Sequence, residues 1–265
     1  MNRSAPESVE VFGLGVPGVG PRFALRLLEL EHQLVQPDVV IFAFFVGNDF
    51  TDEQAHGLET WTETAVARHS YAFRLFRNLL RLRDGHPAED LLSVDSADRA
   101  GENGEDRASG HTTRTGDPAM KRSRFLWVEG RRMQISTKAH REEFVALAGD
   151  VGRVLGRFRD EVEASGSEFL VLIIPDCFQT DNRVREGALQ HLGLSPEEVD
   201  IDLPQRHLGE ILNGIGVAYL DLLPRFREHP DPASLYRQNG THWTPRGNRL
   251  AGLALAEHIQ TLKEI

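Results

Sequence analysis

The sequence has a single cysteine, Cys177, and contains neither a C-x-x-C nor an H-E-x-x-H pattern. An intrachain disulfide framework is therefore excluded, and no recognisable metal motif is present. No apolar run approaches the roughly 20 residues that cross a bilayer, and the start MNRSAPESVEV lacks the apolar segment of a signal peptide. We therefore expect a soluble chain without a metal or other cofactor and without a membrane segment, cytoplasmic by default.

Basic residues are also in deficit, since 30 Lys and Arg stand against 40 Asp and Glu and give a formal net charge of −10. This balance argues against a nucleic-acid backbone or an anionic membrane as the main partner. The hydrophobic fraction of 40% suffices for a buried core in a chain of 265 residues. We expect a globular protein that binds a neutral or small ligand, and its oligomeric state stays open.

Apolar residues follow strand and helix spacing in alternation along the chain. The continuous apolar run at 39–46 indicates a strand that is buried on both faces of a parallel sheet, and Pro37 ends the helix before it. Other strands are predicted at 9–12, 168–176 and 216–223, with a short strand or hairpin at 125–133 and helices at 21–36, 71–82, 144–164, around 208–212 and after Thr244. This order predicts a single α/β domain, 1–265, folded as a three-layer sandwich.

The stretch 84–120 departs from this pattern because it is polar and rich in Gly, Asp, Glu, Ser and Thr. It has too few large apolar residues to offset the entropy of ordering, so we expect a disordered insertion.

Three glycines, Gly13, Gly15 and Gly18, follow the first predicted strand at the spacing G-x-G-x-x-G. A dinucleotide site would also require an acidic residue about 20 positions on, at the end of the next strand. Asp38 has that separation, but it opens the strand at 39–46 instead of closing it. A tight turn that uses the conformational freedom of glycine is the plainer interpretation.

Two other loops stand where ligands of open α/β sheets bind, beyond the carboxyl ends of strands. They are Gly47-Asn48-Asp49 and the segment NGTHWTPRGNRLAG, which includes His242. Together with GVPG at 15–18, they resemble the SGNH, or GDSL-like, family of ester hydrolases from about residue 9 to the C-terminus. The motifs FFVGNDF and THWTPRGNRLAG are most similar to bacterial members that act on acylated sugars or polysaccharides.

The resemblance implies a role for four residues. The backbone N–H of Gly18 and the side chain of Asn48 would bind the oxyanion, each contributing roughly 3 kcal/mol of transition-state stabilisation. His242 would be the general base. Asn239 takes the position of the acid that orients this histidine, and it brings no negative charge, so we expect a weaker base. We also expect Gly18, Asn48 and His242 to converge on one pocket.

The nucleophile of that family lies in a G-D-S block on the first strand, and no G-D-S occurs in this sequence. Only Ser4 and Ser8 precede Gly18, and neither has the flanks of a strand or a sharp turn. Cys177 follows a strand and is an alternative nucleophile, although a buried thiol without a role is the simpler interpretation.

The resemblance also implies a flavodoxin-like sheet of strand order 2-1-3-4-5, in which the missing first strand sits between 9–12 and 39–46. We therefore expect a truncated domain, whose parent carries the serine and is a candidate for membrane anchoring or export.

Three functions follow from these observations. The first is hydrolysis of an O-acyl ester, or transfer of its acyl group to a glycan by the same machinery. The second is noncatalytic binding of acylated glycans, and the third is nucleotide binding.

Overall fold

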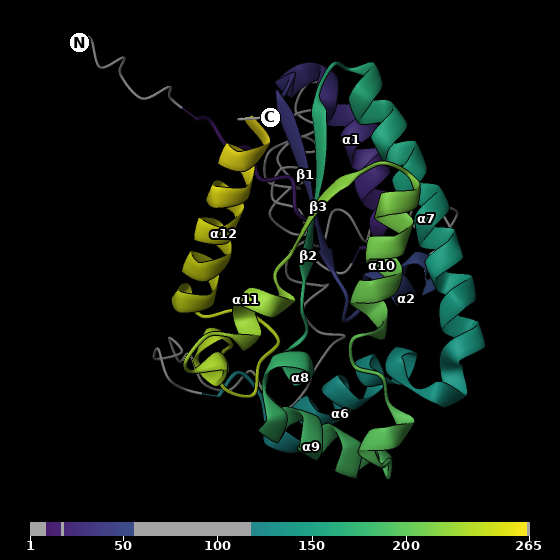
Figure 1. Ribbon diagram of the computed structural model, residues 1–265, viewed down its shortest axis with the longest axis vertical. Helices are drawn as coiled ribbons and strands as arrows, with labels where there is room; N and C mark the ends of the chain where they lie inside the picture. The colour runs from purple at the N-terminus through teal and green to yellow at the C-terminus, as the bar shows by residue number, and fades with distance from the viewer. Residues whose placement is uncertain (1–8, 17–18, 56–117, 264–265) are drawn as a thin grey trace, which may run out of the picture.

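The structure is a computed structural model that describes residues 9–16, 19–55 and 118–263. Within these residues strands and helices alternate, as Figure 1 shows. The α-helices are α1 (Pro21–Val35), α2 (Asp49–Ala55), α6 (Arg122–Met133), α7 (Arg141–Ala164), α8 (Cys177–Thr180), α9 (Asn182–Leu192), α10 (Leu203–Gly214), α11 (Leu223–Arg227) and α12 (Pro245–Lys263). Short 3-10 turns lie at Gln134–Ser136, Lys138–His140, Pro196–Glu198 and Pro232–Leu235.

A parallel sheet forms the middle layer. Its described strands are β1 (Val39–Phe45), β2 (Glu168–Ile174) and β3 (Ala218–Asp221), and they lie in the order β1-β2-β3. All pairs are parallel, so the three strands point their carboxyl ends toward the same edge of the sheet. The prediction of an α/β fold with a parallel sheet is confirmed.

The first face of the sheet is covered by α1, α7 and α10, which lie together on one side in Figure 1. Alternate strand residues, such as Phe44 and Val171, point to this face. Helix α7 supplies the apolar stripe predicted for it, including Phe144, Val151 and Phe158. This layer is a continuous apolar core.

The second face is covered by α12, with α6, α8, α9 and α11 gathered beyond the carboxyl ends of the strands (Figure 1). Helix α12 begins as predicted: the Thr244 hydroxyl accepts the Gly247 N–H at 3.3 Å, and Pro245 is its first residue. The apolar cluster on this face includes Leu172 of β2 and Leu220 of β3.

Strand β1 is only partly covered, which corrects the prediction that it is buried on both faces. Its residues Phe42 and Phe44 pack on the first face, but Ile41 is 37% exposed on the second face and Ala43 is exposed too. No strand among the described residues pairs with the outer edge of β1. Among the described residues, β1 is therefore an edge strand.

Two predicted elements are wrong. The segment 9–12 forms no strand, and Val9 and Val11 are 84% and 85% exposed. The segment 125–133 belongs to helix α6. Its buried positions Phe125, Glu129 and Met133 repeat every four residues, and the apolar pattern breaks at a buried glutamate.

Three further predictions lie outside the described residues: the helix at 71–82, the insertion at 84–120 apart from 118–120, and the role of Ser4 and Ser8. None of the helices in the described residues has the length and hydropathy needed to cross a membrane.

Candidate functional site

The loop after β1 holds Asn48 in a fixed position. The hydrogen bonds between β1 and β2 continue one residue past β1, where the Val46 N–H donates to the Ile174 carbonyl at 3.1 Å. The chain then turns into α2, and the Asn48 carbonyl accepts the N–H groups of Thr51 and Asp52 at 2.8 and 2.7 Å. The Asn48 side-chain amide donates to the Asp52 carboxylate. This contact orients the amide and leaves its second N–H for another acceptor.

Asp49 is the buried acid of the same loop, with 8% of its surface exposed. Its carboxylate accepts the backbone N–H of Phe45 at 2.8 Å. Desolvation raises the pKa of Asp49 to about 8, against the opposing effect of that hydrogen bond. The sequence motif includes this residue, but no pattern in the sequence indicates that it is buried.

The loop after β2 contains a buried acidic pair that sequence reasoning missed. Asp176 caps α8 by accepting the Cys177 N–H at 2.6 Å, and Glu129 of α6 brings a second carboxyl group beside it. Neither side chain is exposed. Burial raises the pKa of both carboxyl groups, and for Glu129 the neighbouring Asp176 raises it further. Arg132 lies 3.3 Å from Glu129 and 3.8 Å from Asp176 and opposes these shifts.

Asp176 also touches the turn after β1. A Cβ atom placed on Gly47 would lie 2.2 Å from Asp176 Oδ2 and 2.5 Å from the Phe45 ring. Only glycine fits such an approach. The loops that follow β1 and β2 are thus packed directly against each other.

Cys177 is a poor nucleophile in this setting. The thiol is buried, and its pKa is raised by desolvation first and then by the charges of Glu129 and Asp176. Because the thiolate is the reactive form, this environment disfavours attack by Cys177.

The loop with Asn239 and His242 precedes α12. Its two sides meet in an antiparallel bridge between Tyr236 and Trp243, and the His242 carbonyl accepts the Arg237 N–H at 2.9 Å. Asn239 turns the chain with a φ of 46°. The buried Tyr236 hydroxyl donates to the Pro175 carbonyl at 2.8 Å, which ties this loop to the carboxyl end of β2.

The predicted site residues that the structure describes stand at the same end of the sheet, and no side-chain hydrogen bond joins them. Asn48 follows β1, and the His242 loop is fastened beside the end of β2. His242 is exposed, and within the described residues its ring makes no hydrogen bond with Asn48 or Asn239. Gly18 lies outside the described residues, so the convergence of the three remains a prediction.

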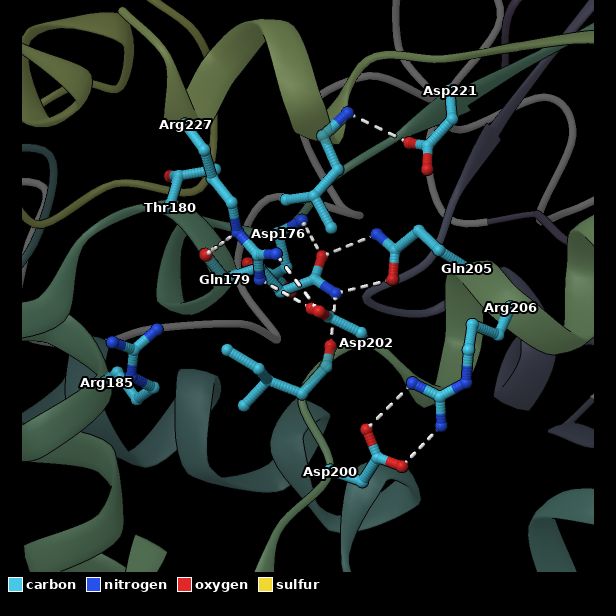
Figure 2. Close-up of polar contacts among 12 residues, drawn as sticks. Asp176, Gln179, Thr180, Arg185, Asp200, Asp202, Gln205, Arg206, Asp221 and Arg227 are labelled. Carbon is cyan, nitrogen blue, oxygen red and sulfur yellow. Dashed lines mark hydrogen bonds and ion pairs between the residues drawn. The ribbon is translucent and has the colours of Figure 1, made fainter. Parts of the chain in front are cut away.

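Two hollows, of 610 and 580 Å³, are lined by residues of α8, α9, α10 and α11 and of the segments next to them. Asp202 and Arg227 line both of them. Figure 2 shows Arg227 between α8 and the start of α10: it donates to the Gln179 carbonyl at 3.0 Å and to both carboxylate oxygens of Asp202 at 3.1 and 2.5 Å. Asn48, Asn239 and His242 line neither hollow, so these cavities and the predicted catalytic residues do not coincide.

Beside this ion pair, a buried pair of side-chain amides joins the start of α10 to α8. Gln179 and Gln205 donate to each other at 2.6 and 2.9 Å, and the Gln179 amide also donates to the Ile201 carbonyl at 2.6 Å (Figure 2). Such reciprocal amide contacts have a structural role here, since they use up the polar atoms that a ligand would need.

The residues that the structure describes contain no cluster of three or more His, Cys, Asp or Glu side chains fit to hold a metal ion. No family model matches this chain, and no curated protein or solved structure matches it.

Proposed function

We propose that this chain is an SGNH-type ester hydrolase domain that acts on O-acyl esters, specifically those of carbohydrates, with a nucleophilic serine that the 265 residues do not contain. The placement of two loops supports the proposal. Asn48 follows β1 directly, and the Tyr236 hydroxyl fastens the His242 loop beside the end of β2. Both loops therefore stand at the edge where ligands of parallel sheets bind.

The open edge of β1 is the observation that carries the proposal. The outer backbone groups of β1 have no partner strand among the described residues, and Ile41 and Ala43 are exposed. The segment 9–12, which forms no strand, is exposed as well. One additional strand could pair with this edge of β1, and the family resemblance implies that the serine-bearing strand lies there.

The chemistry would proceed through an acyl-enzyme. The serine oxygen forms a bond to the ester carbonyl carbon while His242 takes its proton, and the oxyanion is bound by Gly18 N–H and the Asn48 amide. The intermediate then expels the sugar alkoxide, which receives the proton from His242. Water cleaves the acyl-enzyme by the same steps and releases the carboxylic acid.

Asn239 sets the expected strength of the base. Its side chain makes no hydrogen bond to His242 among the described residues, and an amide would not stabilise a charged imidazole as a carboxylate does. An Asn239→Asp variant of the active form should therefore be faster than its parent.

The experiment compares the 265-residue chain with a version extended at its N-terminus by a G-D-S strand. The chain alone should show negligible turnover of a chromogenic acetyl ester and no labelling by a fluorophosphonate. The extended protein should show both, and His242→Ala in it should abolish turnover, while His191→Ala, an exposed histidine on α9, should not. Serine labelling of the unextended chain at Ser4 or Ser8 would contradict this assignment.

Acyl transfer is the variant of this function that the same residues support. Measuring acetate release from an acetylated sugar, with and without an acceptor glycan, separates the two. A transferase would form acylated acceptor in preference to free acetate.

Noncatalytic binding of acylated glycans is the second candidate, and the Asn48 contact favours it. One amide N–H is already engaged by Asp52, and the position three residues before His242 is Asn239 instead of an acid. Binding of acetylated but not deacetylated glycan, with no turnover by the extended protein, would select this function. Nucleotide binding ranks third, because the described residues before Gly13, 9–12, form no strand. A measured dinucleotide affinity would be needed to support it.

A further inference from the structure

Two buried carboxyl oxygens at the carboxyl edge lack a hydrogen-bond donor. Within the described residues, Glu129 Oε2 and Asp176 Oδ2 have no donor, and both side chains are 0% exposed. Buried polar atoms in folded proteins are nearly always hydrogen-bonded, so two such atoms on adjacent carboxyl groups require an explanation.

Arg132 does not supply the missing donors. Its guanidinium lies 3.3 Å from Glu129 Oε1, which is the other oxygen of that carboxyl group, and 3.8 Å from Asp176 Oδ2, which is beyond hydrogen-bond distance. One guanidinium also balances only one of two carboxylates. A second negative charge would remain uncompensated in a site that excludes water, which is unfavourable.

The groups around the pair add no positive charge. Helix α8 contributes the Cys177 thiol, Asp181 follows it, and the Tyr236 hydroxyl donates to the Pro175 carbonyl. From α9, His191 packs against Gly130, the residue after Glu129, and is itself exposed. The turn at Gly47 brings only backbone against Asp176.

We propose that Glu129 and Asp176 share a single proton through neutral pH, and that this proton fastens α6 to the Gly47 turn. A proton between the two carboxyl groups gives one oxygen a donor and the other an acceptor, and it leaves one negative charge for Arg132 to balance. Two carboxylates can only accept, so the two unpaired oxygens can be joined by a hydrogen bond only if one carboxyl group holds this proton.

The proton has a consequence for the neighbouring loop. Asp176 Oδ2 stands directly against Gly47, and Glu129 belongs to α6. Loss of the proton at alkaline pH would place two like charges in contact and push α6 away from the turn that carries Asn48. The inference does not depend on the proposed hydrolase function.

The test measures urea unfolding between pH 5 and pH 9 for the wild-type chain and for Glu129→Gln. Because the folded state holds a proton that the unfolded state has released above about pH 4, stability is greatest in acid and falls as pH rises. Each such proton raises the unfolding equilibrium constant about tenfold per pH unit. Near pH 6, the unfolding equilibrium constant of Glu129→Gln should therefore rise about tenfold less per pH unit than that of the wild type. The contribution of Asp49 to this pH dependence should be unchanged.

Asp150→Asn is the matched control. Asp150 pairs with Arg153 three residues on, as Glu129 does with Arg132, but it lies on the exposed side of α7. This variant should keep the wild-type pH dependence. Equal pH dependence in the wild type and in Glu129→Gln would overturn the proposal.

A second measurement covers the case in which Glu129→Gln fails to fold. Carbon-13 labelling of Glu and Asp carboxyl groups in the wild-type chain follows each titration by NMR, and Asp176→Asn, which keeps an acceptor for Cys177, assists the assignment. We expect one carboxyl of the pair to remain protonated at pH 7, in addition to Asp49. Ordinary acidic titration of both Glu129 and Asp176 would refute the shared proton.

Discussion

The first face of the sheet is packed with hydrophobic side chains, whereas the second face and the carboxyl edge bury carboxyl groups, amides and a thiol. On the first face, Phe44 and Phe50 lie with ring centroids 4.9 Å apart, and Phe50 and Phe144 follow at 5.0 Å. Around α8, the buried set instead includes Asp176, Gln179 and Cys177. The first region is built for stability, while the second holds groups whose state depends on pH and hydrogen bonding.

Phe44→Ala should have the largest effect, because it removes a fully buried ring at the centre of the first face. We expect a loss of about 3–5 kcal/mol in the free energy of unfolding. Chemical denaturation measures it, with Leu30→Ala, an exposed position on α1, as a control that should change little. A loss below 1 kcal/mol would contradict the view that this face supplies the stability.

Gly47→Ala tests the close approach of the two loops at the carboxyl edge. The added methyl group would overlap Asp176 Oδ2 and the Phe45 ring, so we expect a loss of about 1–3 kcal/mol. The matched control is Gly156→Ala in α7, where a Cβ meets no atom within 4 Å and the helix should gain stability. Similar thermal shifts for both variants would show that the loops are not in contact.

Asp49→Asn tests whether a buried carboxyl group at the carboxyl edge makes the stability of the fold depend on pH. The pKa of Asp49 is about 8 in the fold against an ordinary value of 3.8, because burial disfavours the charged form, so the folded state keeps a proton that the unfolded chain has lost. Stability should therefore fall as pH rises from about 4 to 8, by up to about 1.4 kcal/mol per pH unit. The variant should lose this dependence, and a variant with the wild-type slope would disprove the assignment.

Asp202→Asn should have the smallest effect. The Asp202–Arg227 ion pair is partly exposed, with 41% and 34% of the two side chains accessible, and such pairs contribute less than about 1 kcal/mol. Melting temperatures at low and high salt measure it, and the small difference should shrink as salt rises. A large decrease in melting temperature would show that this ion pair stabilises the fold as strongly as a buried polar contact does.

Sequence patterns predict the parts of the fold in which hydrophobic spacing is regular. The runs that form β1 and β2, and the stripe of α7, are recognised because each element buries apolar residues at its own period. The pattern at 125–133 favours a short strand or hairpin instead of helix α6, because Glu129 interrupts the apolar stripe of the helix. The strand at 9–12 was predicted from local propensity, but a strand also needs a partner, which the described residues do not provide.

The candidate site was accessible to sequence reasoning only in part. Asn48 and His242 stand in recognisable motifs at the ends of predicted elements, and chain order places their loops. The contact between Glu129 and Asp176 joins segments that are far apart in the chain, and no local sequence pattern in either segment predicts it. The pairing arises from tertiary packing of α6 against α8, whose N-cap is Asp176.

The uncovered edge of β1 has a consequence for the behaviour of the isolated chain. Its sequence, VVIFAFF, is uncharged, free of proline and rich in β-branched and aromatic residues, and such an edge is a template for intermolecular β-sheet growth. Charged residues that flank such a strand oppose its association with other chains. Asp38 supplies a charge directly before β1, but Asp49, which follows the strand, is uncharged when it is protonated. Purified chain at high concentration should therefore self-associate through this strand, and a lysine in place of the exposed Ala43 should keep it monomeric.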